Sequence, residues 1–332
     1  MAYHVIGAGR TEKVSQKTAA IGIDVGGASA RVALVDLRGR ILFQTASPTG
    51  LGITGRRLLA SLERGARAAL RTAAKRDIRV AGVGVGMPAF LDESGRVAGA
   101  SNLPRVNGTP VGRILEERLG LAVCVENDVS AAACGEYHFG GHRGSSRRML
   151  LLAVGTGVGA GMIVDGRLMR LSHGCLGDPG HVIVDPSGAS PCRCGGNGCL
   201  EAVASGWALM EQARRLGIKA TPGQIFRRAR SGDPACTRLA RRAAAATGVG
   251  LASLSALLEP DTIALGGGVA LEAGEPFRRL AARAWRAHAV PFLSRGARVV
   301  LARAGAEAGV LGAAALILFE NQESAGPYRA RA

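Results

Sequence analysis

One pattern constrains the fold of this chain more than any other: a strand, a glycine turn and a second strand, found twice about 130 residues apart. The first copy consists of an apolar strand, a Gly-Gly turn and two further strands, at residues 20–24, 26–27, 32–35 and 41–44. The second copy consists of a strand, a glycine-rich turn and a strand, at residues 149–154, 155–159 and 162–164. The repetition predicts two related α/β halves.

Helices are expected around these strands. Alanine-rich or amphipathic patterns predict helices at 56–76, 111–119, 205–216, 221–230, 234–258, 275–289 and 309–319, the last of them apolar enough to be buried. Short apolar runs predict further strands at 80–84, 122–125, 262–265 and 297–301. Strands that alternate with helices favour sheets with parallel members, covered on both faces.

The 332 residues carry a formal net charge of +17, which raises nucleic acid or an anionic membrane as a partner. Because lysine occurs only four times, arginine supplies 38 of the 42 basic residues, and these occur singly or in pairs without interleaved aromatic residues. This dispersion favours a solvated surface over a nucleic-acid-binding role. No stretch reaches the roughly 18 apolar residues of a membrane span, so no membrane association is expected.

Three of the seven cysteines lie close together in the sequence, as Cys192, Cys194 and Cys199, and His181 precedes them by eleven residues. A C-x-C-x₄-C spacing with interleaved glycines and one histidine predicts a closed, tetrahedral Cys₃His zinc site, which would be structural because it leaves no open position. The zinc would fix the loop that carries Glu201. Unpaired structural cysteines are the alternative, and either interpretation suits a reducing compartment, the cytoplasm.

Three glycine clusters end predicted strands, at 26–27, 155–161 and 266–268. Without a Cβ atom, such a turn lets backbone N–H groups approach phosphate oxygens, and Asp24 just before the first turn could hold Mg²⁺ through water. Each turn alone could be a tight hairpin, but three together favour nucleotide binding. The spacing matches neither a P-loop nor a Rossmann fingerprint.

Asp128 lies where a predicted strand runs directly into a helical pattern. It could cap that helix by accepting from its first free N–H groups. It could instead be a carboxylate at the carboxyl end of a strand, where open α/β sheets place their ligands, ready to take a proton from a hydroxyl.

In their order along the chain, these motifs resemble those of the ROK family of sugar kinases (repressors, open reading frames, kinases), over about residues 21–316. IGIDVGG and GTGVGAG resemble the two phosphate loops, SNLP the sugar loop, VENDVSAAACGE the catalytic segment, GDPGH with CRCGGNGCLE the zinc signature, and IALGGGV the adenosine-side loop.

The resemblance implies an α/β fold of two actin/hexokinase-type (RNase H-like) domains with an interdomain cleft. The small N-terminal domain would comprise 18–120 plus the C-terminal helix 309–320, and the larger domain, with the zinc loop, 121–308; residues 1–17 and 321–332 would be flexible tails.

The implied activity is transfer of the ATP γ-phosphoryl group to a hexose hydroxyl, with glucose as the leading substrate and Asp128 as general base. The side chains expected to contact the sugar are Asn102, Asn127, Asp128, Asp178, His181 and Glu201, with His181 ligating zinc through its other ring nitrogen. The residues expected at ATP and Mg²⁺ are Asp24, Gly26, Gly27, Gly155, Thr156, Gly157 and Gly267. A homodimer or higher homo-oligomer is also implied.

The chain departs from the family pattern at three places. Ala28 replaces the usual threonine after Gly-Gly, Asp178 replaces a glutamate three residues before the histidine, and Arg105-Val106-Asn107 follows the sugar loop where many members carry a tryptophan. These departures keep open a sugar-binding pseudokinase and kinases for N-acetylmannosamine or fructose. A sugar-responsive regulator is less expected, because only about 20 residues precede the first motif, too few for a helix-turn-helix domain.

Overall fold

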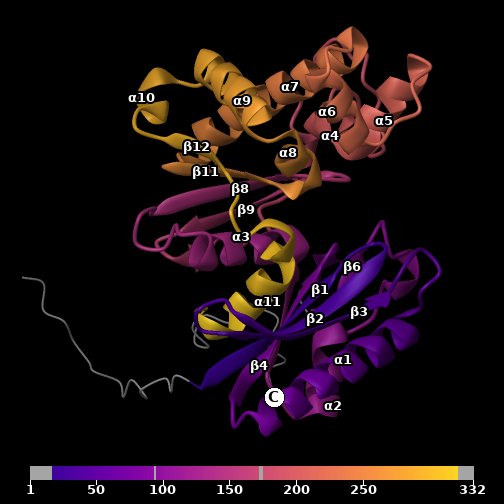
Figure 1. Cartoon of the computed structure of the whole chain (residues 1–332), viewed down its shortest axis with the longest axis vertical. Coiled ribbons are helices and arrows are strands. Elements are labelled where there is room, and N and C mark those ends of the chain that lie inside the picture. The colour runs from indigo at the N-terminus through magenta and orange to yellow at the C-terminus, as the bar shows by residue number, and fades with distance from the viewer. Residues whose placement is uncertain (1–16, 93–94, 172–174, 321–332) are drawn as a thin grey trace, which may run out of the picture.

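The computed structural model describes residues 17–92, 95–171 and 175–320, and its centre is a pair of five-stranded sheets with the same strand arrangement (Figure 1). The first sheet has the order β3-β2-β1-β4-β7, formed by Ile41–Pro48, Ser29–Asp36, Thr18–Val25, Arg79–Met87 and Val123–Asn127. The second has the order β10-β9-β8-β11-β12, formed by Arg167–Leu168, Val158–Val164, Arg148–Val154, Thr262–Gly266 and Arg298–Leu301.

The directions in which neighbouring strands pair are also the same in the two sheets. In each sheet the first three strands in chain order are antiparallel, and two further strands join in parallel beside the first of them. Parallel neighbours need a crossover connection, and helices supply it in both halves. The prediction of two related α/β halves is therefore confirmed.

The helices of the first half cover one face of its sheet. They are α1 (Gly55–Lys75) and α2 (Val111–Leu119). Helix α1 begins where the Thr54 hydroxyl accepts from the N–H of Arg57, and it buries Leu58 and Leu62 against the sheet. A small hairpin of β5 (Phe90–Leu91) and β6 (Val97–Gly99) lies between β4 and α2.

The second half carries a larger helical layer, drawn in orange at the top of Figure 1. Its helices are α4 (Leu200–Ala204), α5 (Gly206–Arg215), α6 (Pro222–Arg230), α7 (Pro234–Leu258), α8 (Gly267–Ala273), α9 (Glu275–His288) and α10 (Pro291–Ser294). Their buried side chains join those of β8, β9 and β11 in one hydrophobic core that includes the fully buried Trp285. None of the helices in the described ranges combines the length and the apolar character of a membrane span.

Two helices, α3 (Asp128–Phe139) and α11 (Ala308–Leu318), lie between the sheets (Figure 1). They pack closely because glycines stand at their crossing: a Cβ atom on Gly135 would lie 2.6 Å from the carbonyl oxygen of Ala308, and one on Gly312 would overlap that of Ala131. Gly22 and Gly84 allow α11 the same close approach to β1 and β4. The expectation of a buried C-terminal helix is therefore confirmed.

Two expectations need correction. The domain boundary expected at 120/121 falls before β7, but β7 pairs with β4, so this strand completes the first sheet. The strand expected at 162–164 begins four residues earlier, at Val158, because Gly159 and Gly161 lie within it and make room for Val129 and Ala133 of α3. The expected flexible tails, apart from Lys17, lie outside the described residues.

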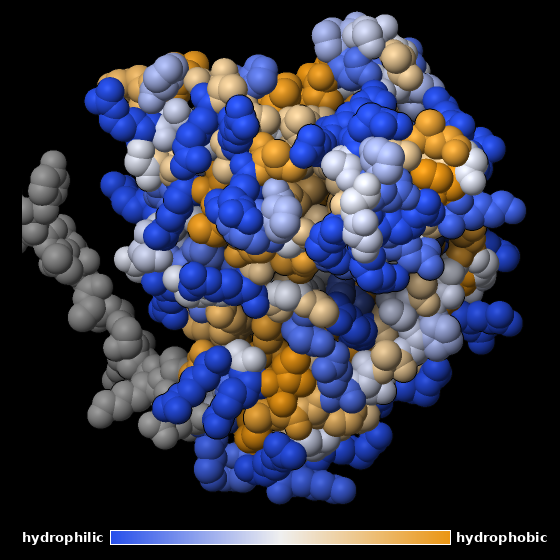
Figure 2. Space-filling view, turned by 45° about the horizontal axis from the view of Figure 1, so that its top comes forward, coloured by the Kyte–Doolittle hydropathy of each residue, from blue (hydrophilic) through white to orange (hydrophobic). Residues whose placement is uncertain are grey.

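On the face drawn in Figure 2, hydrophilic side chains are spread over both halves and mixed with hydrophobic ones. Many of the arginines pair locally with acidic neighbours one helical turn away, as Arg67 does with Glu63 and Arg113 with Glu117. Exposed pairs of this kind contribute little to stability.

Candidate active site

A cavity of about 620 Å³ lies between the two halves. Its lining includes Asp24 at the end of β1, Asp128 at the start of α3, and Gly267 after β11. The parallel strands β1, β4 and β7 run in one direction, so the residues after their carboxyl ends meet at one edge of the first sheet. The fold thus brings two carboxylates and a glycine turn from distant parts of the chain to one place.

Asp128 is the first residue of α3, and its Oδ1 accepts from the N–H of Val129 at 2.9 Å. The cap is Asn127, whose Oδ1 accepts from the N–H groups of Val129 at 3.0 Å and Ser130 at 3.1 Å. The N-cap position expected for Asp128 therefore belongs to Asn127, although Asp128 shares the N–H of Val129 with it. Burial, and after it the nearby negative charge of Asp24, raises the pKa of Asp128 from 3.8 to about 6.

Asp24 is held by an arginine that the sequence analysis missed. Arg31 stands opposite it in the β1–β2 register, and its Nη2 donates to Oδ2 of Asp24 at 2.7 Å. Arg31 also lies 3.6 Å from a carboxylate oxygen of Glu307, in the 3₁₀ turn Gly305–Glu307 before α11. Gly309 lies directly against Asp24, where a Cβ atom would come within 2.5 Å of its Oδ2.

Glu136 is a second residue of the cavity lining that sequence reasoning missed. Its side chain is fully buried and accepts from Nε2 of His142 at 2.9 Å and from the N–H groups of Arg303 and Ala304 at 2.9 and 2.8 Å. Burial by itself would raise its pKa, but the hydrogen bonds from His142 and the backbone outweigh burial and leave the pKa lowered. Glu136 thereby ties α3 to the segment before α11.

The first glycine turn lies beside the sugar loop expected from the resemblance. The N–H of Gly26 donates to the carbonyl of Ser29 at 2.8 Å, and the Thr49 hydroxyl donates to the carbonyl of Gly26 at 2.7 Å. A Cβ atom on Gly27 would lie 3.4 Å from Cβ of the exposed Asn102. This turn is therefore near Asn102 and does not line the cavity of Asp128.

The second glycine turn, at 155–159, contacts the first residues of two helices, α5 and α8. The carbonyl of Gly155 accepts from the N–H of Gly206 at 2.8 Å, and a Cβ atom on Gly155 would lie 3.8 Å from the backbone nitrogen of Gly268. Gly267 has φ +81° and no room for a side chain beside Val154. The turn is thus packed between α5 and α8, with Thr156 exposed at its tip.

Glu201 is bound at both carboxylate oxygens. Oε2 accepts from the N–H of Val158 at 2.8 Å, and Oε1 accepts from Nε1 of Trp207 at 3.3 Å. A Cβ atom on Gly157 would lie 2.5 Å from Oε2, so the carboxylate fits against a residue without a side chain. Glu201 therefore lies directly under the second glycine turn.

Asp178 and His181 stand next to Glu201. Nε2 of His181 lies 3.3 Å from Oδ2 of Asp178 at the 3₁₀ turn Pro179–His181. Burial raises the pKa of Asp178, His181 opposes this rise, and the negative charge of Glu201 adds to it. The structure thus brings together three of the side chains expected at the sugar.

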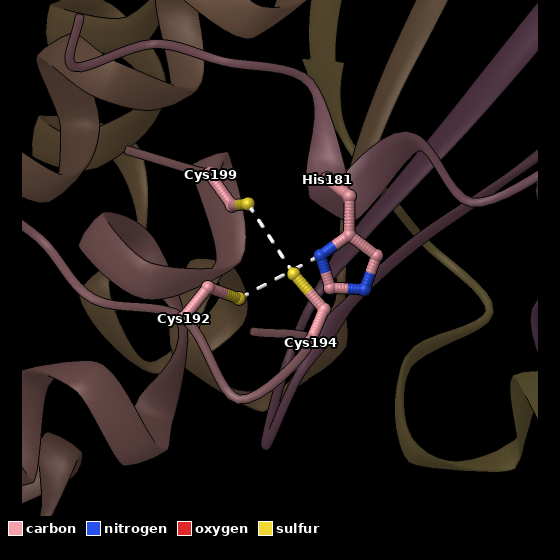
Figure 3. A group of neighbouring side chains, drawn as sticks. All are labelled: His181, Cys192, Cys194 and Cys199. Atoms are coloured by element: carbon pink, nitrogen blue, oxygen red, sulfur yellow. Dashed lines mark hydrogen bonds between the residues drawn. The ribbon is translucent and has the colours of Figure 1, made fainter. Parts of the chain in front are cut away.

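The other ring nitrogen of His181 faces the cysteine cluster, in which the four side chains point toward one another (Figure 3). Nδ1 of His181 lies 3.6 Å from Sγ of Cys192, and the Sγ atoms of Cys194 and Cys199 are 3.8 Å apart. Ligands at tetrahedral zinc distances lie about 3.8 Å apart for two sulfurs and about 3.6 Å for sulfur and nitrogen. The donor set and the spacing therefore fit a tetrahedral Cys₃His metal site.

The Asp128 cavity and the Glu201 group are linked through the start of β9. Val129, next to Asp128, packs on Gly159, where a Cβ atom would lie 2.9 Å from its Cγ2. Val158, one residue before Gly159, is the donor to Glu201. The two groups of side chains are thus neighbours around the end of one strand.

The sequence and the structure of this chain are both similar to those of known sugar kinases. A family model described as "ROK family" matches residues 20–320. The glucokinase of Halalkalibacterium halodurans is 30% identical over 90% of this chain and 94% of its own length. The ROK hexokinase structure from Thermus thermophilus is 36% identical, with a TM-score of 0.78, covering 93% of this chain and all of that one.

A ROK family glucokinase from Streptomyces griseus, solved in complex with glucose and AMPPNP, is 33% identical with a TM-score of 0.71, covering 90% and 98% of the two chains. The matches also include a xylose repressor from Caldicellulosiruptor bescii, 30% identical over 74% of this chain and 65% of the repressor. The family match spans nearly all of the described residues, and both of these solved kinase structures match this chain with TM-scores above 0.7 over at least 90% of its length. This chain, with its actin/hexokinase-like fold, belongs to the ROK family.

Proposed function

We propose that this protein is an ATP-dependent hexose kinase, which transfers the γ-phosphoryl group of ATP to a sugar hydroxyl. The observation that carries the proposal is the state of Asp128. It lies in the cavity between the two halves, and Asn127 holds the N-cap position of α3 in its place. Burial, and after it the charge of Asp24, raises the pKa of Asp128 to about 6. A general base works best when its pKa lies near the working pH.

In this reaction Asp128 takes the proton of the sugar hydroxyl as the oxygen forms its bond to the γ-phosphorus, and the bond to ADP breaks. The protein has to position the two reactants, exclude water and balance negative charge, since little covalent chemistry is needed from it. The two domains that meet at the cavity would exclude water from the reacting groups. In this proposal the C-terminal helix at 309–320 belongs to the smaller domain.

The ATP side of the proposal rests on the glycine turns. The backbone at Gly26, Gly27, Gly155, Thr156, Gly157 and Gly267 would approach its phosphates, because side chains are small or absent there. Asp24 would hold Mg²⁺ through water. Two neighbouring carboxylates at Asp24 and Asp128 suit a hard cation, which would neutralise charge on the phosphates. A relative with bound AMPPNP and glucose supports this half of the proposal.

The sugar would lie among Asn102, Asn127, Asp178, His181 and Glu201, with glucose as the leading substrate because the matched relatives include enzymes named glucokinase. His181 would donate or accept at the sugar through Nε2, while Nδ1 faces the metal site. The departure at Asp178 shortens one of the carboxylates by a methylene, so N-acetylmannosamine and fructose stay as substrate alternatives.

A zinc ion would be held by His181, Cys192, Cys194 and Cys199, and its role would be structural since the four ligands close the coordination shell. By fixing this loop it would fix Glu201, two residues after Cys199. No disulfide joins cysteines among the described residues, which suits a reducing compartment, and we propose that this compartment is the cytoplasm. A homodimer or higher homo-oligomer remains a prediction.

Release of ADP, measured with Mg-ATP and a panel of glucose, mannose, fructose, N-acetylmannosamine and xylose, tests the proposal. We expect release that depends on a hexose and is fastest with glucose. The second candidate, a sugar-binding regulator or pseudokinase, is favoured by the match to a repressor and by Ala28 and Asp178. Sugar binding without ADP release from any member of the panel would support that candidate and contradict ours.

A further inference from the structure

Trp207, the second residue of α5, contacts three parts of the site at once. Its indole Nε1 donates to Oε1 of Glu201 at 3.3 Å. Its backbone N–H donates to the carbonyl of Thr156, at the tip of the second glycine turn, at 3.4 Å. The guanidinium carbon of Arg193 lies 4.5 Å from the centre of its ring. Neither the family motifs nor the proposed reaction assigns a role to Trp207 or Arg193.

The Arg193 contact joins Trp207 to the Cys₃His cluster. Arg193 stands between Cys192 and Cys194, so the direction of its side chain follows the conformation that those two cysteines impose on the loop. A cation over an indole ring is attracted to it, and here the ring is half-buried while Arg193 is exposed. A change in the loop would therefore alter the surroundings of the indole ring.

Glu201 connects Trp207 to the start of β9. Glu201 accepts from Trp207 at one oxygen and from Val158, the first residue of β9, at the other. Its carboxylate has little freedom, because Gly157 lies against it. A change in the position of the Trp207 ring would therefore act on a carboxylate that is proposed to bind the sugar, at the turn proposed to bind ATP.

We infer that Trp207 is a positioning residue that couples the metal loop, through Arg193, to Glu201 and to the second glycine turn. The inference rests on the proposed function only for its effect on the sugar. The coupling itself is a property of the folded chain and can be measured without turnover.

Tryptophan emission provides that measurement, because the chain contains only Trp207 and Trp285. Trp285 is fully buried and donates to the hydroxyl of Ser255 at 2.9 Å, so its emission reports on the integrity of the fold. Removal of the metal by a chelator should shift the emission of the wild-type protein. The Trp207→Phe variant, which has only Trp285 to emit, should show no shift.

Variants of Arg193 separate the coupling from simple loss of the metal. In the metal-loaded protein, Arg193→Gln should reduce the shift that the chelator produces, and Arg193→Lys should restore it by returning the cation. The matched control is Arg286→Gln, because Arg286 lies 5.7 Å over Trp285 in a second Arg–Trp pair of the described chain and should leave the shift intact. If chelation also shifts the emission of Trp207→Phe, the signal of Trp285 shows that the fold itself has changed. The inference is then tested on the metal-loaded Arg193 variants, through their KM for the hexose.

Kinetics supply the second readout. Trp207→Phe keeps a ring under Arg193 but loses the donor to Glu201, so the KM for the hexose should rise about tenfold, as for loss of a hydrogen bond to a charged group, with a smaller effect on kcat. Arg193→Gln should act in the same direction and Arg286→Gln should not. The inference is overturned if the emission of the wild-type protein does not change when the metal is removed, or if Trp207→Phe has the wild-type KM for the hexose. A wild-type protein without ADP release but with the emission shift would contradict only the proposed function.

Discussion

The carboxylates of Asp24 and Asp128 line the same cavity, although 104 positions of sequence separate the two residues. Asp24 ends β1 and Asp128 follows β7, and β4 lies between these strands in the sheet. Their proximity follows from parallel strands that deliver their carboxyl ends to one edge. The negative charge of Asp24 adds to burial in raising the pKa of Asp128 to about 6. The pair thus forms a site suited to a cation and a mobile proton.

The pH dependence of kcat/KM should report this pair. A base must be deprotonated to act, so activity should fall about tenfold per pH unit below the pKa of Asp128, which is about 6. Asp24→Asn removes one of the two causes of the raised pKa, so the acidic limb of the profile should move to lower pH even if the rate itself falls. A limb that stays in place after this change would show that Asp24 does not act on the catalytic group.

The free energy of unfolding should depend on pH in the opposite direction to the activity: ionisation of Asp128 favours the reaction but disfavours the folded state. Folding raises the pKa of Asp128 from 3.8 to about 6, so the ionised carboxylate destabilises the folded state above pH 6 and has no such effect below about pH 4. Two pKa units correspond to about 3 kcal/mol. Asp128→Asn should therefore raise the free energy of unfolding by up to about 3 kcal/mol at pH 8, with the gain vanishing toward pH 4.

Denaturant unfolding at the two pH values measures this difference. Asp165→Asn is the control, because Asp165 is exposed and pairs with Arg147 at the surface, and its loss should change the midpoint little. A gain that is equal at both pH values would mean that the carboxylate charge is not its source.

Gly267 and Gly268 offer a matched pair for the turn after β11. Gly267 has φ +81° and no space for a Cβ atom beside Val154, whereas nothing lies within 4 Å of the Cβ position of Gly268. Gly267→Ala should lower the free energy of unfolding by about 1–3 kcal/mol and weaken ATP binding, while Gly268→Ala should change stability by less than about 1 kcal/mol. Equal unfolding midpoints for the two variants would contradict the packing described for this turn.

Metal content tests the Cys₃His assignment. The purified protein should contain about one zinc ion per chain by elemental analysis, and Cys194→Ser should lose it, because the remaining three ligands no longer close a tetrahedral site. Cys236→Ala, at a buried cysteine outside the cluster, should keep the metal. Full zinc content in Cys194→Ser, or none in the wild-type protein, would refute the site.

The sequence predicted those features that local patterns encode. The glycine turns, the buried helix α11, the long helix α7 and the cysteine cluster all have short-range signals. The start of β9 was misplaced because Gly159 and Gly161 are typical of turns, and only the packing of α3 explains their presence in a strand. The helix α8 was missed for the same reason, since it begins at Gly267.

The supporting residues of the site could not be predicted. Asn127 and Asp128 both suit a helix cap, and only the folded geometry decides between them. Arg31 and Glu136 have partners 7 and 167 positions away, and nothing in their local sequence distinguishes them from the other arginines and acidic residues. Trp207 is one of two tryptophans, but its hydrogen bond to Glu201 depends on how α5 packs against the second glycine turn. Pairings of this kind depend on tertiary structure, which local patterns do not contain.

The central claim is that Asp128 takes the proton of a hexose hydroxyl, and ADP release by Asp128→Asn tests it most directly. With Mg-ATP and glucose, the variant should release ADP at least about 10²-fold more slowly than the wild type. Its zinc content and glucose affinity should stay close to wild type, and Asp165→Asn should keep the wild-type rate. Equal rates of ADP release from Asp128→Asn and the wild-type protein would contradict the account.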